Sequence, residues 1–275
     1  MRFGFALRLM GTAANAGVLR ESALRAEAAG LDTLWVPDHI AIPPDETEGS
    51  NGRYLDALSS LAWLAAATDR IRLGTAVLVI PYRATLPTAK VIATLQELSG
   101  DRLELGVGVG WMEAEFRALG VERNKRGHLT DEFLAFLHSA SEAEQDEVEL
   151  NGQPFVFRPN PTRPRLWIGG GAPHALERAA KFGEGWMPMG DDPDKIRSHA
   201  EELRSRFAER RRGTPEIAVF GALGRRSVED DLDRLHALEA LGVTEYIQGA
   251  RYEDLDGFAR SFEPFLERIT EFKSR

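Results

Sequence analysis

The sequence predicts an α/β domain of the (β/α)8, or TIM, barrel class, and two observations lead to this prediction. First, an amphipathic helical pattern that ends in glycine and leads within a few residues into an apolar strand recurs along the chain. Second, eight strand starts can be placed at intervals that mostly suit one βα unit. Alternating helices and strands imply parallel pairing, and eight units close a barrel. An open doubly wound sheet is the alternative.

The recurring unit is clear in four places. The copies read LRAEAAG before LDTLWV, VIATLQELSG before DRLELGVGV, ALERAAKFG before EGWMP, and LDRLHALEALG before VTEYIQG. The helical patterns end on Gly30, Gly100, Gly183 and Gly242. Glycine is favoured just past a helix because it adopts a left-handed conformation without a Cβ penalty. We therefore expect all four glycines to end helices in that conformation.

In chain order, the strands are expected to start near Arg2, Thr33, Ile71, Leu103, Leu166, Trp186, Ile217 and Glu245. The interval between the fourth and fifth strands is about twice the usual length for a βα unit, which predicts an insertion there. Its polar part is residues 141–165, where LNGQ predicts a hairpin turn between two short strands. A helical pattern follows the last strand at residues 255–272. Barrels of this length commonly form one domain, so we expect a single domain over residues 1–275.

Composition limits the classes of partner. The 275 residues are 43% hydrophobic and carry a formal net charge of −9, so nucleic acid and anionic membrane surfaces are expected to be repelled. The chain has no cysteine, which excludes disulfides, thiolate nucleophiles and cysteine-bound zinc. The N-terminal apolar stretch is too short for a signal peptide, and no uncharged run is long enough to span a bilayer. We expect a cytoplasmic protein.

Two proton-active side chains stand at the end of the second strand. Residues 33–39 read TLWVPDH, so that Asp38 and His39 follow an otherwise apolar segment. The loops at the carboxyl ends of barrel strands build the concave functional face, where this pair is expected. An imidazole beside a carboxylate can hold or move a proton near neutral pH. The alternative is a helix N-cap aspartate beside a loop histidine, since aspartate after proline is a common turn residue.

The fourth strand carries glycine on alternate positions. Residues 105–111 read LGVGVGW, so one face of the strand lacks side chains and a flat ring could lie against it. The alternative is close packing of a neighbouring segment, which glycine permits. The pattern is not a Rossmann fingerprint, because Trp111 stands where that motif needs glycine.

The fifth strand leads into a glycine-rich loop and a helix. Residues 166–181 read LWIGGGAPHALERAAK, with the helix expected to open at Ala172 or Pro173. Proline suits the first helical turn because its missing amide is not needed there. Unobstructed amides at a helix N-terminus form a phosphate site. The alternative is a plain flexible βα turn.

Two further observations concern charge and metal binding. Arg83 follows the third strand and either pairs with an anionic group of a ligand or is a solvated loop charge. The six histidines form neither a His-x-His pair on a strand nor a His-Glu-x-x-His motif. No metal site is predicted.

The motifs together resemble the bacterial luciferase-like superfamily, and especially its coenzyme F420-dependent (deazaflavin) oxidoreductases. The resemblance covers essentially the whole chain. It rests on FGFAL, AEAAGLDTLWVPDH, RIRLGTAVLVIPYR, IATLQELSGDRLELGVGVGWMEAEFRALG, RGHLTDE and RPRLWIGGGAPHALERAAKFGEGWMP.

The resemblance implies a cofactor ring in the barrel mouth. His39 would be the catalytic residue facing the hydride-carrying centre, and Asp38 would bind polar atoms of the ring. Ala76 and Val77 match the position of a non-prolyl cis peptide that backs the ring in similar proteins.

The resemblance also places the rest of the cofactor. Val109 and Gly110 would border the ring, while the amides of Gly170, Gly171 and Ala172 would hold the phosphate. This phosphate position agrees with the independent argument from the helix N-terminus.

Apolar side chains at the strand ends predict a substrate wall. Trp111, Met112, Met187 and Met189 are expected to form an adaptable apolar surface, and the alternative for each is packing at the barrel rim. Similar enzymes that oxidise sugar phosphates carry a glutamate in place of Trp111, so a sugar phosphate is not the expected substrate.

Three functions follow from this resemblance. The first is hydride transfer between coenzyme F420 and a small organic substrate, with the cofactor supplying the chemistry. The second is an FMN-dependent monooxygenase of the same fold, and the third is a non-catalytic flavin-binding barrel. The expected partner is a small molecule, and a homodimer is the assembly to be tested.

Overall fold

The computed structural model describes residues 1–47, 49–143 and 146–275, and these form a closed barrel of parallel strands. Strand order around the barrel is β1-β10-β9-β8-β7-β4-β3-β2, with β1 paired to β10 to complete the closure. The strands are β1 (Arg2–Ala6), β2 (Thr33–Val36), β3 (Arg72–Val79), β4 (Leu103–Gly108), β7 (Arg165–Gly169), β8 (Gly185–Met187), β9 (Glu216–Gly221) and β10 (Glu245–Gln248). Every strand starts within one residue of its predicted position, and the predicted (β/α)8 barrel is confirmed.

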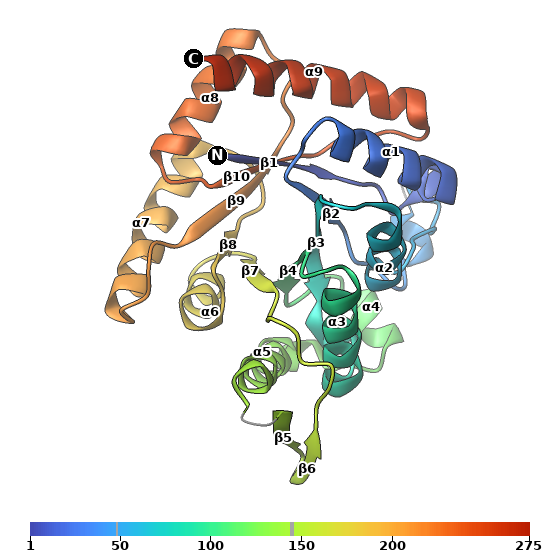
Figure 1. Ribbon diagram of the computed structural model, residues 1–275, viewed down its shortest axis with the longest axis vertical. Helices are drawn as coiled ribbons and strands as arrows, with labels where there is room; N and C mark the ends of the chain where they lie inside the picture. Colours follow the sequence, from blue (N-terminus) through green and yellow to red (C-terminus); the bar gives the residue numbers. More distant parts are fainter. Residues whose placement is uncertain (48, 144–145) are drawn as a thin grey trace.

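Helices surround the barrel, as Figure 1 shows. They are α1 (Ala16–Ala28), α2 (Ala57–Ala67), α3 (Thr85–Leu98), α4 (Glu113–Ala118), α5 (Arg126–Glu142), α6 (His174–Phe182), α7 (Pro193–Glu209), α8 (Val228–Ala240) and α9 (Leu255–Ser274). Short 3-10 turns are η1 (Gly11–Ala13), η2 (Pro44–Glu46), η3 (Ile80–Tyr82) and η4 (Arg123–Lys125). Within the part of the chain that the structure describes, no helix is both long and apolar enough to cross a membrane.

The predicted insertion lies between β4 and β7. It contains α4, η4, α5 and an antiparallel hairpin of β5 (Glu147–Leu150) and β6 (Gln153–Val156), which extends away from the barrel in Figure 1. Asn151 and Gly152 have φ values of 53° and 75°, the left-handed pair that a tight hairpin turn needs. The predicted LNGQ turn is therefore confirmed, while Glu144 and Gln145 of the predicted insertion lie outside the described residues.

Helix ends follow local sequence signals, with one exception. The side chains of Asn15 and Asp254 accept amide hydrogen bonds that open α1 and α9. Gly30, Gly100 and Gly242 have φ values of 76°, 68° and 83°, as predicted. The prediction for Gly183 is wrong, because its φ is −100°. A Cβ there would lie 3.0 Å from the carbonyl oxygen of Leu166, so close approach explains this glycine.

The core has two layers. Inside the barrel, one cluster contains Trp35, Trp167, Met187, Ala218 and Ile247, all buried. Outside it, apolar side chains of the strands pack against the helices in a larger cluster. On β1, for example, Phe5 packs against Phe258, Phe262 and Phe265 of α9 at ring centroid distances of 5.1, 5.6 and 6.2 Å. The inner layer ends below the cavity described in the next subsection.

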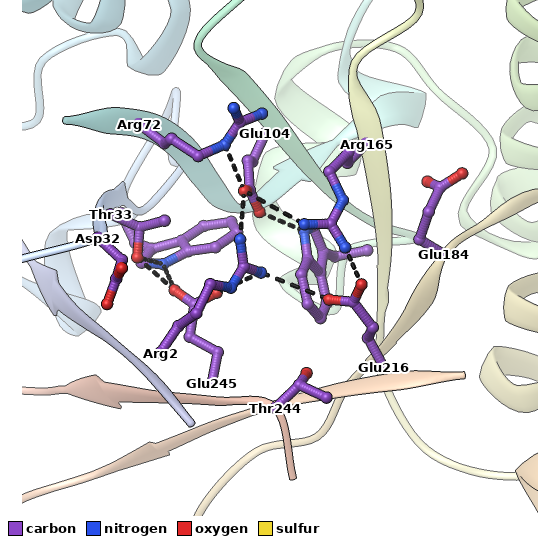
Figure 2. A network of polar contacts seen from close by, with 12 residues as sticks. Arg2, Asp32, Thr33, Arg72, Glu104, Arg165, Glu184, Glu216, Thr244 and Glu245 are labelled. Atoms are coloured by element: carbon purple, nitrogen blue, oxygen red, sulfur yellow. Dashed lines mark hydrogen bonds and ion pairs between the residues drawn. The ribbon is translucent and has the colours of Figure 1, made fainter. Parts of the chain in front are cut away.

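A charged network closes the amino-terminal end of the barrel, shown in Figure 2. We call Arg2, Arg72, Arg165, Glu104, Glu216 and Glu245 the floor network. Glu104 is fully buried and accepts from Arg2, Arg72 and the indole of Trp167 at 2.8, 2.6 and 2.7 Å. Glu245 is also buried and pairs with Arg2 at 2.8 Å. The floor network thus contains three arginines and three glutamates, and two of the glutamates are buried.

Candidate active site in the barrel mouth

A cavity of about 450 Å³ opens at the carboxyl ends of the strands. Nine of the predicted site residues line it, together with Pro37, Val79, Tyr82, Gly108, Gly169, Met189 and Phe220. The nine are Asp38, His39, Ala76, Val77, Val109, Gly110, Trp111, Gly170 and Met187. They lie in or directly after five different strands, from β2 to β8. The barrel closure thus brings together residues that lie far apart in the sequence, and their individual roles stay predictions.

A second cavity of about 320 Å³ adjoins the first. Both are lined by Val109, Gly169 and Gly170, and the second extends to the start of α6 and α5. Gly171 lines only this second cavity, whereas Ala172 lines neither. The helix opens at His174, with Pro173 as its N-cap, slightly later than predicted.

The second cavity has the features of an anion site. A Cβ built on Gly171 would meet nothing within 4 Å, so a ligand can approach the backbone there. Arg126, Arg178 and His174 add cationic or hydrogen-bonding side chains around the helix N-terminus. Arg178 is held by Asp131, whose Oδ1 accepts from Nε at 2.6 Å. A phosphate group with its negative charge fits this donor set.

Asp38 has partners other than those predicted for it. Its carboxylate, whose side chain is fully buried, accepts from the two terminal nitrogens of Arg83 at 2.6 and 2.7 Å and from the amide of Val79 at 2.9 Å. Arg83 also donates to Asp56 at 3.1 Å. The carboxylate therefore ties the β2 loop to the end of β3 while it also lines the cavity, and the binding of ring atoms by Asp38 stays a prediction. Arg83 is neither a free ligand-binding cation nor a solvated loop charge.

His39 is held by a buried glutamate, Glu115 of α4. His39 Nδ1 lies 2.9 Å from Oε2 of Glu115, which also accepts from the hydroxyl of Tyr82 at 2.9 Å. The other oxygen of Glu115 accepts from the amides of Ile40 and Ala41 at 2.6 and 3.0 Å. One carboxylate thus joins the loops that follow β2, β3 and β4.

These contacts decide the charge of Glu115. Burial alone would raise its pKa, but the hydrogen bonds from His39, Ala41 and Ile40 lower the pKa of the carboxyl to about 2. Burial and the neighbouring Glu115 anion raise the pKa of the Tyr82 hydroxyl, which stays protonated as a donor. Glu115 is consequently an anion at any pH near neutrality.

The side chain of His39 also contacts aromatic residues of the cavity rim. Its ring centroid lies 5.0 Å from that of Tyr54 and 6.3 Å from that of Trp111, the latter edge to face. Its Nε2 atom makes no hydrogen bond with any of the described residues, so it is the ring nitrogen left to meet a ligand.

The glycine-rich face of β4 is packed against β3. A Cβ on Gly106 would lie 2.0 Å from the carbonyl oxygen of Thr75, and one on Gly108 would lie 2.5 Å from Val77. The peptide between Ala76 and Val77 is cis, as the resemblance implied, and the register of β3 with β4 shifts there. Close packing is therefore the correct explanation of these glycines, and the prediction of a ring lying flat on this face is wrong.

The predicted apolar wall is present with one exception. Trp111, Met187 and Met189 line the cavity, and Trp111 and Met189 are 63% and 90% exposed at its rim. Met112 is buried and does not line the cavity, so its prediction as a wall residue is wrong. Phe220 of β9 completes the wall.

Sequence reasoning missed the residues whose partners are distant in the chain. Glu115 follows Trp111 in MEAEFRA, where an acidic residue in the first turn of a helix is common. Arg126 and Arg178 gave no local signal beyond their charge. The fact that Glu115 is buried at His39 depends on the positions of β2 and β4 in the barrel.

The cavities fit a ring with a phosphate-bearing chain and do not suggest a metal. The larger cavity falls in the size range of small-molecule sites, and its glycine-bordered edge leads to the anion site. Among residues 1–47, 49–143 and 146–275, no group of three or more histidine, aspartate or glutamate side chains could hold a metal ion. The expectation of a bound flavin or deazaflavin is thus compatible with the residues present.

Comparison with known proteins identifies similar chains. The family model described as luciferase-like monooxygenase matches residues 1–271. An uncharacterized protein of Mycobacterium tuberculosis is 31% identical over 271 residues, which cover 89% of this chain and 91% of that protein.

Two relatives with named activities use different cofactors. An FMNH2-dependent dimethylsulfone monooxygenase of Pseudomonas putida is 27% identical over 156 residues, which cover 53% of this chain and 42% of that protein. The solved structure of an F420-dependent secondary alcohol dehydrogenase has a TM-score of 0.79 at 16% identity and covers 98% of each chain. The second likeness concerns the fold alone.

Proposed function

This chain belongs to the luciferase-like monooxygenase family, and from this premise we propose that it is an oxidoreductase that transfers a hydride between coenzyme F420 and a small organic substrate. The observation that carries the proposal is the pair of adjoining cavities, one apolar with His39 in its wall and the other lined by arginines and open glycine backbone.

The ring of the cofactor belongs in the larger cavity and its phosphate in the smaller one. Ala76, Val77, Val109 and Gly110 border the larger cavity on the β3 and β4 sides. Beyond Gly170, the amides at the start of α6 and the guanidinium groups of Arg126 and Arg178 provide favourable electrostatics for an anion.

Bound F420 would supply a hydride in its reduced form or accept one in its oxidised form. When a carbonyl is reduced, the hydride goes to the carbonyl carbon and the oxygen needs one proton. His39 in its protonated form can deliver that proton from Nε2 and become neutral, and the reverse transfer serves alcohol oxidation. The apolar wall places few polar groups beside the reacting centre.

The cavity wall favours a neutral substrate of apolar character. Trp111, Met187, Met189 and Phe220 provide its surface, and Arg83 is occupied by Asp38 and Asp56. Among the described residues that line this cavity, no lysine or arginine could pair with a carboxylate or phosphate on the substrate. A ketone, an enone or a secondary alcohol on a hydrocarbon frame fits this chemistry.

The volume of the anion site supports F420 over FMN. At about 320 Å³, the anion site reaches the size range of small-molecule sites, which is more room than a single terminal phosphate needs. F420 continues past its phosphate into a lactyl-oligoglutamate chain, whereas FMN ends there. The FMNH2-dependent relative is the observation that keeps an FMN monooxygenase as the second candidate.

A titration of both cofactors tests the proposal. We expect F420 to bind more tightly than FMN when binding is followed by quenching of cofactor fluorescence, and reduced F420 to reduce a test enone or ketone in the absence of oxygen. If FMN binds at least tenfold more tightly, a difference of about 1.4 kcal/mol, the monooxygenase function replaces this proposal. Tight binding without turnover of any substrate would favour the non-catalytic flavin-binding barrel.

A further inference from the structure

The hydrogen bonds of Glu115 go beyond what is needed to hold the loops of the barrel mouth together. It is fully buried, comes from a helix of only six residues, and receives donors from two other segments, the loop after β2 and the turn after β3. A carboxylate needed only to join loops could bond to backbone amides alone. Half of its hydrogen-bonding capacity is instead directed at the side chains of His39 and Tyr82.

We propose that Glu115 is a positioning residue that selects the tautomer of His39, so that Nδ1 carries the proton and Nε2 faces the ligand as a proton acceptor. The proposal deepens the proposed function, on which the catalytic use of His39 rests. It also gives Tyr82 a role as a donor that holds Oε2 of Glu115 in place.

The tautomer follows from the chemistry of the donors and acceptors. An ionised carboxylate can only accept hydrogen bonds, so the 2.9 Å contact with Oε2 requires a proton on His39 Nδ1. In neutral imidazole the second nitrogen then has a free lone pair. When Nε2 takes up a proton, the Glu115 anion stabilises the imidazolium without any movement of the ring. The same ring position thus serves both halves of a proton transfer.

Replacement of Glu115 by glutamine should reverse the tautomer of His39. The amides of Ile40 and Ala41 are fixed donors at 2.6 and 3.0 Å, so the glutamine oxygen must face them. Its amide nitrogen then faces His39 and Tyr82 and can only donate. Nδ1 must become the acceptor, which moves the proton to Nε2 and blocks that nitrogen as an acceptor for a ligand.

Two matched variants separate this effect from loss of structure. Tyr82→Phe removes one donor to Oε2 but leaves a carboxylate beside His39, so the tautomer should not change. Glu113→Gln alters a side chain on the same helix that is 64% exposed and touches neither His39 nor Tyr82. Both variants should retain the tautomer of the wild-type protein.

The test combines nitrogen NMR of the protein without cofactor with steady-state kinetics. Imidazole ¹⁵N shifts at pH 8 distinguish protonated from unprotonated ring nitrogens, and His39→Asn identifies the His39 signals among those of the six histidines. We expect the Nδ1–H form in the wild-type protein, Tyr82→Phe and Glu113→Gln, and the Nε2–H form in Glu115→Gln. With oxidised F420 and a secondary alcohol, the direction in which Nε2 must accept a proton, Glu115→Gln should lower kcat at least tenfold with little change in KM.

A wild-type tautomer in Glu115→Gln would overturn the proposal, and so would a reversed tautomer with an unchanged kcat. The NMR measurement needs no cofactor. If the wild-type protein neither binds nor turns over F420, the proposed function fails, and the tautomer result by itself then decides the role of Glu115.

Discussion

The two ends of the barrel both bury carboxylates and treat them in opposite ways. At the mouth, hydrogen bonds lower the pKa of Glu115 to about 2 despite burial. At the floor, burial raises the pKa of Glu245 to about 7; the nearby Glu104 anion adds to the rise, while Arg2, Thr33 and Trp35 oppose it. The comparison shows that burial does not set the charge of a carboxyl group by itself. The hydrogen-bond donors and charges around the carboxyl group decide whether it is ionised.

The difference lies in how the donors are distributed. Both oxygens of Glu115 accept two hydrogen bonds each. On Glu245, Thr33 and Trp35 both donate to Oε1, while Oε2 has Arg2 2.8 Å away but no aligned hydrogen bond among the described residues. Arg2 also donates to Glu104. Burial alone would raise the pKa of Glu104, but Arg2, Arg72 and Arg165 lower it and keep this carboxylate ionised.

The two ends also differ in what they leave for a ligand. The floor network satisfies its own charges, so it can stabilise the barrel but offers little to a substrate. The mouth leaves Nε2 of His39 and the backbone amide of Gly171 without hydrogen-bond partners among the described residues. Unsatisfied polar groups beside a cavity are typical of a binding site, and the predictions below test this division between stability and function.

The largest effect is expected from His39→Ala at the mouth. Loss of a positioned acid–base group should reduce turnover with reduced F420 and a test ketone by on the order of 10²–10⁴. The protein should remain folded with a modestly lower unfolding temperature, because buried Glu115 loses one of its four hydrogen bonds. His128→Ala, at a histidine on the exposed surface of α5, is the control and should retain full turnover. Normal turnover in folded His39→Ala would remove His39 from the mechanism.

The next effect concerns stability at the floor. Glu104→Ala should lower the free energy of unfolding by about 3 kcal/mol, because it removes the fully buried carboxylate that pairs with three partly buried arginines. Urea denaturation measures this value. Glu216→Ala removes a carboxylate of the same network that is 28% exposed, and its loss should cost about 1 kcal/mol or less. Equal losses in the two variants would contradict the assigned importance of burial.

A smaller effect is expected from a charge placed in the anion site. Gly171→Asp puts a carboxylate into open space at the start of α6, without the strain that the φ of 115° imposes at Gly170. Repulsion should weaken F420 binding about ten- to a hundredfold, or about 1.4–2.7 kcal/mol, in a fluorescence titration. Gly213→Asp, where a Cβ also meets nothing within 4 Å, adds the same charge outside both cavities and should leave binding unchanged. If the wild-type protein and both variants bind F420 equally tightly, the phosphate does not bind at this site.

The smallest effect is on the pH dependence of stability, which should differ between Glu245 and Glu115. Because the folded-state pKa of Glu245 is raised from 4.5 to about 7, the folded protein holds the extra proton, and stability falls as pH rises between these values. Glu245→Gln should remove this slope, which is at most about 1.4 kcal/mol per pH unit.

Glu115 should have the opposite dependence in another pH range. Its lowered pKa gives stability that is present above about pH 4.5 and is lost as pH falls toward 2. Glu115→Gln should therefore change the slope only in acid. Urea denaturation across pH 3–8 measures both, and parallel curves for wild type and Glu245→Gln would contradict the raised pKa of Glu245.

The sequence by itself determined the order and type of the elements. Glycines after helices, apolar strands and the Asn-Gly turn act over a few residues, so the eight strand starts and the hairpin at 151–152 could be read locally. The sequence also placed Asp38, His39 and Gly171 on one face of the barrel. They follow strands, and the carboxyl ends of all strands in a barrel lie on the same face.

Only the tertiary structure decided which side chains meet. His39 and Glu115 are 76 positions apart, and Asp38 and Arg83 are 45 apart. No local pattern indicates that the Asp38 carboxylate binds Arg83. Nor does a local pattern indicate that β3 packs against the glycine face of β4. Capping and periodicity depend on neighbours along the chain, whereas these contacts depend on the distance between strands that barrel closure sets.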